Sequence, residues 1–424
     1  MKIKKIIGFI RNDYVFSVFI KIMMMAISVL HSAFLARFLG AELRGVAATI
    51  CSTVALSQIL LSCGIHQAYA CFRKEDKSNR FTEIFVNNVY FLYTLIVVLL
   101  MAAAFVCRGV LPSKYIFVLL LTPLFAYEAV ISYVYLIESP QKKHFWSLLA
   151  SVSETVFLLF LWIFVRPNDF YMCLSISMAI LIRSVAATIG LRVKLDFKKI
   201  SIRFIGKMLR FGFLPMLALA LAVMNSKIDI LMMDWSSYIT SAAIGLYSVG
   251  IAFADKILAI PDAIREILLS HLVAGKSEQE VARVTRLSFF FCIIMASGFA
   301  LLGKPLLHIL YGTEYAGAYR VLVIAAFGTG FMVFLKMISQ YNVVNKRQMA
   351  NLLMLAVSVV TNIVFNLILM PIYGIEGAAI ASFVGPLVCA LCFVLYFARV
   401  TKVRPIELII PKKDDFGLLL RREK

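Results

Sequence analysis

Charged and amide side chains within apolar stretches are the residues of this sequence that could do chemistry. Residues 211–233, FGFLPMLALALAVMNSKIDILMM, are long enough to cross a bilayer, yet they contain Asn225, Lys227 and Asp229. A charge in hydrocarbon costs at least roughly 2.5–3.5 kcal/mol, and such residues usually face a bundle interior or a watery cavity. The pattern indicates a helix that lines a path for polar cargo.

Helix geometry separates the two charges of this stretch. Residues two apart point about 200° from one another, so Lys227 and Asp229 cannot form a local ion pair. Asp229 shares a face with Asn225 and Ser226, whereas Lys227 points the other way. We therefore expect one charge to line a cavity and the other to meet a neighbouring helix, with Lys227 the better candidate for the cavity.

Other ionisable residues lie within further apolar stretches of the chain. Their positive and negative charges nearly balance, so some are expected to pair across helices. Asp255 and Lys256 are the expected partners of the charges at 227 and 229. Because neighbouring residues point about 100° apart around a helix, at most one of these two side chains faces a cavity directly. The complete set is Lys21, Glu128, Glu154, Arg183, Lys227, Asp229, Asp255, Lys256 and Lys336.

A stripe of amide and hydroxyl groups is predicted near the end of the chain. Asn351, Ser358, Asn362 and Asn366 follow spacings that place them on one face of a helix. Hydrogen bonds between helices, worth about 0.6 kcal/mol each, are the expected use of these groups, and contact with a sugar is the alternative. His31 is expected to pack or to lie at an interface, in preference to relaying protons.

The composition places these residues in a membrane protein. The chain is 62% hydrophobic and 16% charged, with a mean hydropathy of +0.91, which lies outside the range of soluble domains. Among its eight cysteines, Cys389 and Cys392 form a C-x-x-C without a second ligand pair, so packing is expected in place of a metal or redox site. The basic, then apolar N-terminus lacks a clear cleavage site and is expected to be the first span.

Apolar runs of about 20 residues predict an all-α polytopic protein with about twelve transmembrane helices. Of the 43 lysines and arginines, 31 fall at the two termini and in the connections on their side, and 7 fall on the opposite side. This asymmetry predicts that both termini are cytoplasmic. The expected spans are 14–36, 45–66, 84–107, 115–137, 145–165, 170–191, 211–233, 241–262, 287–310, 319–341, 351–371 and 376–398.

The longest basic connection, 192–210, divides these spans into two groups of six. The segments that open the groups, RNDYVFSVFIKIMMMAI and RFGFLPMLALALAVMNSKI, resemble each other weakly. Repeated halves with a substrate site between them are common in secondary transporters. The expected organisation is a six-helix lobe at 1–200, a second lobe at 201–398 and a basic cytoplasmic tail at 399–424.

Signatures of an enzyme or an ATP-driven pump are absent from the sequence. It contains no phosphate-binding loop, no HExxH, no GxSxG and no zinc-ligand spacing, and every outer connection is short. The net charge of +20 follows the positive-inside rule and does not indicate nucleic acid. The sequence therefore predicts no enzyme activity, cofactor or metal, and favours an ion-coupled or gradient-driven transporter.

Four stretches carry a resemblance to a known family. They are RFLGAELRGVAATI, NSKIDILMM with AIGLYSVGIAFADKILAIPDAI, LLHILYGTEYAGAYRVLVIAAFG, and NIVFNLILMPIYGIEGAAIAS. Together they resemble the polysaccharide-transporter branch of the MATE-like (multidrug/oligosaccharidyl-lipid/polysaccharide) superfamily, the Wzx-type flippases. The resemblance covers nearly the whole chain and is strongest from about 205 to 390. Within the last stretch, Pro371 is expected to end a helix and Gly374 to permit a turn.

The resemblance implies two six-helix lobes that form an open V. It implies transfer of an undecaprenyl-pyrophosphate-linked oligosaccharide across the bacterial inner membrane by alternating access, with cavity cations that meet the pyrophosphate and sugars. Membrane lipid and other polysaccharide assembly proteins are the expected partners. The candidate cations are Lys21, Lys227, Arg183 and Lys256, and the candidates for coupling to H⁺ or Na⁺ are Asp229, Asp255, Glu128 and Glu154.

Two other functions stay open. A MATE-type exporter of cationic drugs would favour an acidic pocket, whereas the embedded charges here are balanced to slightly cationic. A membrane polysaccharide polymerase or ligase generally needs a sizeable external loop, which this sequence lacks. Capsule, O-antigen and other exopolysaccharides are all possible cargo.

Overall fold

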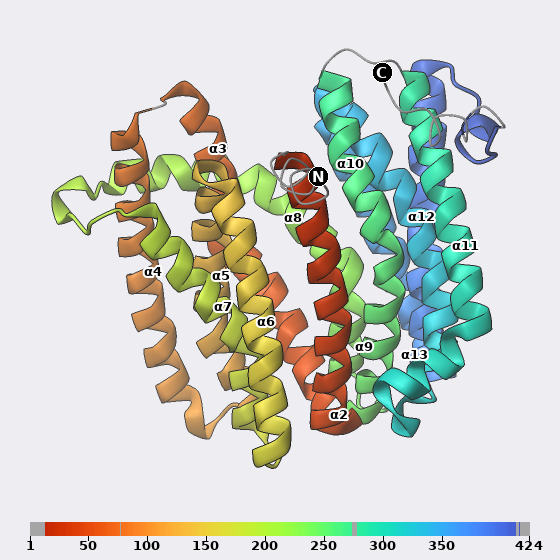
Figure 1. Cartoon of the computed structure of the whole chain (residues 1–424), viewed down its shortest axis with the longest axis horizontal. Helices are drawn as coiled ribbons and strands as arrows, with labels where there is room; N and C mark the ends of the chain where they lie inside the picture. Colours follow the sequence, from red (N-terminus) through yellow and green to blue (C-terminus); the bar gives the residue numbers. More distant parts are fainter. Residues whose placement is uncertain (1–12, 77, 274–277, 413–414, 416–424) are drawn as a thin grey trace, which may run out of the picture. The chain divides into compact units, whose positions relative to one another are not determined.

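The computed structural model describes residues 13–76, 78–273, 278–412 and 415. Every regular element in these ranges is helical, and ten helical stretches are long and apolar enough to cross a membrane (Figure 1). Helices satisfy all backbone polar groups internally, as a lipid environment requires. The α-helices are α2 (Asp13–Ser62), α3 (Ile65–Glu75), α4 (Asn79–Val106), α5 (Ser113–Glu138), α6 (Pro140–Phe164), α7 (Asp169–Leu191), α8 (Ile202–Trp235), α9 (Ser241–Ala254), α10 (Ala259–Val273), α11 (Glu278–Tyr311), α12 (Ala318–Val344) and α13 (Gln348–Thr401).

Two of these helices are much longer than a bilayer is thick. α2 has 50 residues and α13 has 54, and each contains one glycine whose backbone is not helical. Gly40 has φ 68° and ψ 175°, and Gly374 has φ 59° and ψ −132°, conformations that residues with a Cβ rarely adopt. The turn expected at Gly374 is therefore confirmed, whereas Pro371, which was expected to end a helix, lies within α13. The sequence prediction of separate spans on either side of each glycine corresponds to the two parts of one bent helix.

The predicted helix at 241–262 is interrupted in the structure. α9 ends at Ala254, a 3₁₀ turn η3 (Asp255–Leu258) follows, and α10 then extends to Val273. Pro261 has no N–H to donate to the carbonyl of Ile257, which explains a break at this point. The Cys292 thiol lies 3.9 Å from that carbonyl oxygen and donates to it instead.

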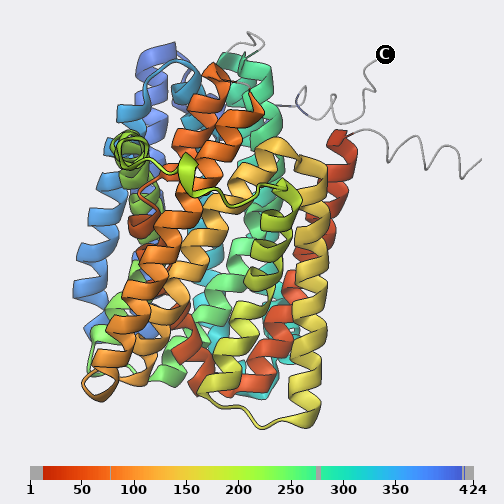
Figure 2. The same cartoon turned by 90° about the vertical axis from the view of Figure 1, so that its left-hand side faces the viewer.

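The chain divides into two compact units, Met1–Val223 and Met224–Lys424, and the division falls within α8. In the first unit, α2 packs against α5, α6 and α7, and α4 packs against α5 (Figures 1 and 2). In the second unit, α12 packs against α9, α10, α11 and α13. The lobe boundary predicted at 200/201 lies before this division, in the connection that precedes α8.

A contact between two glycines fixes the first half of α8 within the first unit. A Cβ added to Gly212 would lie 2.1 Å from the carbonyl oxygen of Cys63, and one added to Gly64 would lie 2.3 Å from the carbonyl oxygen of Gly212. Backbone therefore meets backbone at this crossing, and neither position has room for a side chain.

Two buried asparagines of α4 hold the basic connection that precedes α8. Asn87 accepts from the backbone N–H of Asp196 at 2.7 Å, and Asn88 accepts from that of Ser201 at 2.8 Å. Their amide nitrogens donate in turn to backbone carbonyls of the same connection. The loop is thereby shaped by α4 and joins α7 to α8 in a defined path.

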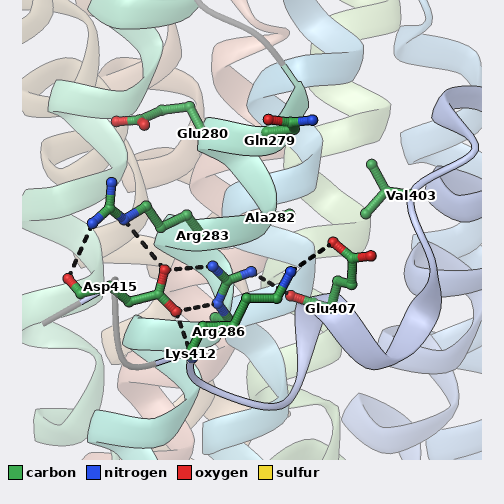
Figure 3. A pocket seen from close by; sticks show the side chains of 9 residues that line it. All are labelled: Gln279, Glu280, Ala282, Arg283, Arg286, Val403, Glu407, Lys412 and Asp415. Carbon is green, nitrogen blue, oxygen red and sulfur yellow. Dashed lines mark hydrogen bonds and ion pairs between the residues drawn. The ribbon is translucent and has the colours of Figure 1, made fainter.

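The C-terminal segment folds back on the first turns of α11. Arg286 donates from Nε and Nη2 to the two carboxylate oxygens of Asp415, and from Nη1 to the carbonyl oxygen of Glu407 at 2.8 Å. Arg283, one turn earlier, lies 3.4 Å from the same carboxylate. Figure 3 shows these groups around a cavity of about 360 Å³. The hydrogen bonds from Arg286 hold the pKa of Asp415 below its ordinary value of 3.8, so the carboxylate stays charged and tethers the segment.

Candidate functional site

A buried carboxylate occupies the second half of α8, in the second unit. Asp229 is 3% exposed, and its oxygens accept hydrogen bonds from three neutral side chains. The Tyr247 hydroxyl of α9 donates to Oδ2 at 2.8 Å, the Ser382 hydroxyl of α13 donates to the same oxygen, and the amide of Asn366 donates to Oδ1 at 2.7 Å. Asp229 therefore joins α8, α9 and both halves of α13.

No cationic side chain that the structure describes forms an ion pair with Asp229. A buried carboxylate that lacks a countercharge is costly, because neutral hydrogen-bond donors replace only part of its hydration. The carboxylate is thus placed to take up a proton or a small cation as its countercharge. Among the described residues no group of three His, Cys, Asp or Glu could hold a metal ion.

The amide nitrogen of Asn366 has more acceptors nearby than its two N–H groups can satisfy in one orientation. The two protons of the Asn366 amide nitrogen face three acceptors: Oδ1 of Asp229, and the side-chain and backbone oxygens of Asn362 at 2.9 and 3.0 Å. The Asn366 oxygen and the Asn362 amide nitrogen are buried and have no partner among the described residues. Rotation of the Asn366 amide group by 180° exchanges its nitrogen and oxygen, and its oxygen then lies beside the oxygens of Asp229 and Asn362. With the Ser382 hydroxyl these oxygens form the type of ligand set that hard cations prefer.

A second hydrogen-bonded group lies one turn earlier on α8. The Ser358 hydroxyl is within hydrogen-bond distance of Oδ1 of Asn225 at 2.8 Å and of the carbonyl of Gly385 at 3.0 Å. A Cβ on Gly385 would lie 3.1 Å from the Cβ of Asn362, so the two halves of α13 approach closely here. These contacts fix the α13 stripe against the face of α8 that carries Asp229.

The predicted polar stripe is therefore divided in the structure. Ser358, Asn362 and Asn366 surround the Asn225 and Asp229 face of α8. Asn351 does not join them, since it accepts from Asn342 at 2.6 Å and donates to the carbonyl of Ser339 at 3.2 Å.

The remaining candidate charges of the second unit gather around η3. Lys336 of α12 lies 2.7 Å from Asp262 of α10, and Asp255 interacts electrostatically with Lys227, Lys256 and Lys336. Lys227 is half-buried and makes no hydrogen bond or ion pair with any residue that the structure describes. Asp229 and Lys227 are thus separated as helix geometry predicts, but Asp229 meets Tyr247, Ser382 and Asn366 instead of the expected pair at 255 and 256.

The candidates of the first unit form two pairs. Arg183 of α7 lies 3.1 Å from Glu128 of α5, which also accepts from Ser132 at 2.9 Å. Glu154 of α6 lies 3.7 Å from His31 of α2. Lys21 belongs to α2, but its side chain is outside the described part of the chain.

Tyr247 and Ser382 are functional candidates that the sequence did not single out. Both lie in stretches rich in small residues, SAAIGLYSVG and EGAAIASFVG, where the glycines and alanines indicate close helix packing. A hydroxyl group within such a stretch indicates a buried polar contact, because close packing buries the hydroxyl and a buried hydroxyl needs a hydrogen-bond partner.

Three solved structures share this fold across almost the whole chain. The structure titled lipid II flippase MurJ, inward closed conformation, aligns with a TM-score of 0.73 at 16% identity, covering 93% of this chain and 89% of that one. An inward-facing multidrug resistance MATE family transporter of the MOP superfamily aligns with a TM-score of 0.66 at 13% identity, covering 92% and 98%. The Vibrio cholerae MATE transporter VcmN aligns with a TM-score of 0.58 at 16% identity, covering 91% and 94%.

The sequence itself matches a family profile. No curated protein matches the chain significantly. The profile described as polysaccharide biosynthesis protein matches residues 34–320, which is more than half of the chain. The fold, the apolar helices and this match agree with the resemblance seen in the sequence, and the chain belongs to the polysaccharide biosynthesis protein family, as a multi-pass membrane protein with the fold of the MOP superfamily.

Proposed function

We propose that this protein is a flippase that moves undecaprenyl-pyrophosphate-linked oligosaccharides across the bacterial inner membrane for surface polysaccharide synthesis. The family match to polysaccharide biosynthesis and a fold shared with a lipid II flippase support this cargo class. Alternating access moves the polar head through the protein while the prenyl tail remains in lipid. The protein acts as a transporter and not as an enzyme.

The proposed topology has twelve crossings, with both termini in the cytoplasm. The lengths of α2 and α13 and the bends at Gly40 and Gly374 support two crossings for each of these helices. Six crossings then fall in each predicted lobe, 1–200 and 201–398, and the tail at 399–424 is cytoplasmic. The distribution of lysine and arginine supports this orientation.

The observation that carries the proposed mechanism is the buried carboxylate of Asp229. Its contacts with Tyr247, Asn366 and Ser382 are all with neutral groups, which supports H⁺ or Na⁺ as the proposed source of its countercharge. Binding of that cation stabilises one arrangement of α8, α9 and α13, and its release permits another. A ligand shifts a conformational equilibrium only through such a difference in affinity. Coupling of glycan movement to a cation gradient follows from this.

Lys227 is the proposed contact for the diphosphate of the cargo. It lies opposite the Asp229 face of α8, is half-buried, and has no ion pair within the described part of the chain. Lys21 and Lys256 are further proposed contacts. Arg183 is less available, because Glu128 already neutralises it.

A cellular experiment tests this function. Deletion of the gene should cause undecaprenyl-linked oligosaccharide to accumulate inside the cell and surface glycan to be lost, and the wild-type gene should reverse both. The double variant K21A/K227A, present at the wild-type level in the membrane, should restore little surface glycan. Full restoration by that variant would remove these lysines from the mechanism. Absence of intracellular accumulation in the deletion strain would argue against the flippase itself.

A further inference from the structure

A cavity of about 640 Å³ lies in the first unit, where α5 packs against both α4 and α7 (Figure 1). Its volume falls within the range of about 300–1,000 Å³ that small-molecule sites occupy. Tyr90, Tyr93, Val97 and Met101 line it from α4 at spacings of three and four residues, which place them on one face of that helix. The cavity therefore extends along α4, parallel to the helix axis.

This cavity has a polar end and an apolar end. The short connection 107–112 joins α4 to α5, so the two helices run in opposite directions. Met101 near the end of α4 and Leu120 near the start of α5 therefore share the apolar end. Tyr90 and Tyr127 share the other end, where their ring centroids lie 6.4 Å apart, and the rings of Tyr93 and Tyr127 lie 5.8 Å apart.

Two hydroxyl groups at the polar end lack a hydrogen-bond partner. The hydroxyls of Tyr127 and Thr188 satisfy each other at 2.6 Å. The hydroxyl oxygens of Tyr90 and Tyr93 are buried and have no partner in the part of the chain that the structure describes, and Tyr93 is only 2% exposed. Buried hydroxyls in proteins are almost always hydrogen-bonded, because an unpaired one is unfavourable. The two tyrosines thus indicate a bound molecule that supplies an acceptor.

The surroundings of the cavity restrict the chemistry of that molecule. None of the described residues that line it is charged, so its acceptor inside the cavity is a neutral group, since an unpaired anion would be costly there. Val98 and Met101, which also line it, are 59% and 55% exposed on a helix that is apolar enough to cross a membrane. A molecule that enters between these side chains comes from the lipid bilayer.

The polar end of the cavity lies beside the basic connection that precedes α8. Leu195 of this connection lines the cavity. Asn87, three residues before Tyr90 on α4, donates to the backbone carbonyl of Lys194, which places Leu195 near the tyrosines. Arg192 and Lys194 are exposed in the same connection. Cations, hydroxyl donors and apolar walls thus follow one another in the order of the phosphate, ester carbonyls and acyl chains of a phospholipid.

We propose that this cavity binds a phospholipid of the surrounding bilayer. An acyl chain lies between α4 and α5, ester carbonyl oxygens accept hydrogen bonds from Tyr90 and Tyr93, and the phosphate lies at the basic connection. The lipid thereby joins α4, α5 and that connection within the first unit. A prenyl phosphate fits less well, because its phosphate is attached directly to the chain and it has no ester carbonyl. The site is separate from Asp229, and it goes beyond the proposed function because it does not depend on the cargo.

A comparison of two lipids tests the role of the ester carbonyls. The probes are dipalmitoyl phosphatidylglycerol and its ether-linked analogue, which has the same head group and chain length but no carbonyl. Native mass spectrometry of the full-length protein in detergent measures the affinity for each. One hydrogen bond to a neutral acceptor changes an affinity by about two- to tenfold, so wild-type protein should bind the ester lipid several-fold more tightly. Equal affinities for the two lipids in wild-type protein would overturn the proposal.

The double variant Y90F/Y93F removes both hydroxyls and keeps both rings. It should bind the two lipids equally, with the affinity that wild-type protein has for the ether lipid. Because the hydroxyls that it loses have no partner, its Tm in lipid-free detergent should equal or exceed that of wild type. The matched control is Y133F, which removes a hydroxyl from α5 outside the cavity, where the ring of Tyr133 faces His66, and it should retain the preference for the ester lipid. Retention of that preference by Y90F/Y93F would contradict the assigned contacts.

Infrared spectroscopy with isotope-labelled ester carbonyls distinguishes the remaining occupants. A hydrogen bond from a phenol lowers the C=O stretching frequency, so lipid bound to wild-type protein should show a shifted band that Y90F/Y93F lacks. An unshifted band in wild-type protein would mean that water satisfies the tyrosines, which would overturn the proposal. Tighter binding of undecaprenyl phosphate than of the ester lipid, lost in Y90F/Y93F, would assign the cavity to a prenyl lipid and overturn it as well.

Discussion

The amide nitrogen of Asn366 lies 2.7 Å from Oδ1 of Asp229, and the hydroxyl of Ser382 donates to the other oxygen of that carboxylate. Asn366 precedes the bend at Gly374 and Ser382 follows it. The bend thus lets both halves of α13 reach one carboxylate of α8. The bend that the positive φ of Gly374 permits therefore also brings together the groups of the candidate cation site.

Two replacements of Asp229 distinguish the effect of its charge on stability from the effect of its hydrogen bonds. D229A leaves the donors of Tyr247, Ser382 and Asn366 unpaired, each at a cost of about 1–3 kcal/mol, so a markedly lower Tm is expected. D229N keeps the shape and removes the buried charge, so its Tm should equal or exceed that of wild type. Thermal unfolding in detergent at several Na⁺ concentrations and pH values measures both effects.

The cation dependence of those unfolding curves carries further information. A cation that binds only the folded protein raises Tm with its concentration. Wild-type protein should show this rise for Na⁺, or for H⁺ as the pH falls, and D229N should not. If D229N unfolds as readily as D229A, the charge of Asp229 serves structure and not cation binding.

The crossing of Gly64 and Gly212 predicts a sharp contrast between two glycines of α8. G212A places a Cβ 2.1 Å from a carbonyl oxygen, and backbone would have to move. Overpacking of this type costs at least about 1–3 kcal/mol. G206A meets nothing within 4 Å and gains about 1 kcal/mol of helix propensity. Tm should fall for G212A and hold or rise for G206A, and equal values would show that α8 is not fixed at this crossing.

The pair of Arg183 and Glu128 predicts unequal effects of removing its two partners. R183Q leaves the carboxylate of Glu128 without its cation and should cost roughly 3–5 kcal/mol, as for buried pairs that lose one partner. E128Q should cost less, because an amide at position 128 still offers Arg183 an oxygen to which it can donate. The double variant E128Q/R183Q completes the cycle in thermal unfolding. Equal losses for the two single variants would contradict this asymmetry.

The tether between Arg286 and Asp415 predicts a pH dependence at the C-terminal segment. The pKa of Asp415 is lowered in the folded protein, so the tether contributes fully above the ordinary value of 3.8 and is lost as the pH falls through the lower, folded value. D415N should release the segment at every pH. Hydrogen exchange at residues 403–412 should thus be slow in wild type from pH 5 to 8 and faster in D415N by tenfold or more, since charged hydrogen bonds contribute about 1.5–3 kcal/mol. Equal exchange in the two proteins at pH 7 would contradict a stabilising tether.

Much of the fold could be predicted from hydropathy alone. Apolar runs the length of a bilayer, broken by glycine and basic connections, predict helices with little ambiguity. The break at η3 was not predicted, because residues 241–262 are long and apolar enough for one span despite their three charges, and the effect of Pro261 is exerted on the preceding turn. The sequence also placed a helix end at Pro371, whereas a proline within a long helix is tolerated when other groups satisfy the freed backbone.

Only part of the candidate site could be predicted from the sequence. The 200° separation of Lys227 and Asp229 and the shared face of Asn362 and Asn366 follow from helix geometry. Which helices meet those faces depends on the tertiary arrangement, and no local pattern encodes it. The sequence therefore favoured Lys227, whereas the structure surrounds Asp229 with groups that include Tyr247 and Ser382, which the sequence did not single out.

We propose that this protein flips a lipid-linked glycan and that Asp229 couples this movement to a cation. The most direct measurement reconstitutes the full-length protein in vesicles that contain undecaprenyl-pyrophosphate-linked oligosaccharide, and follows exposure of the sugar to an external lectin under an imposed Na⁺ or H⁺ gradient. Wild-type vesicles should expose the glycan faster than empty vesicles, and one of the two gradients should accelerate exposure for wild type but not for D229N. Exposure no faster than in empty vesicles, or identical gradient responses for wild type and D229N, would contradict the account.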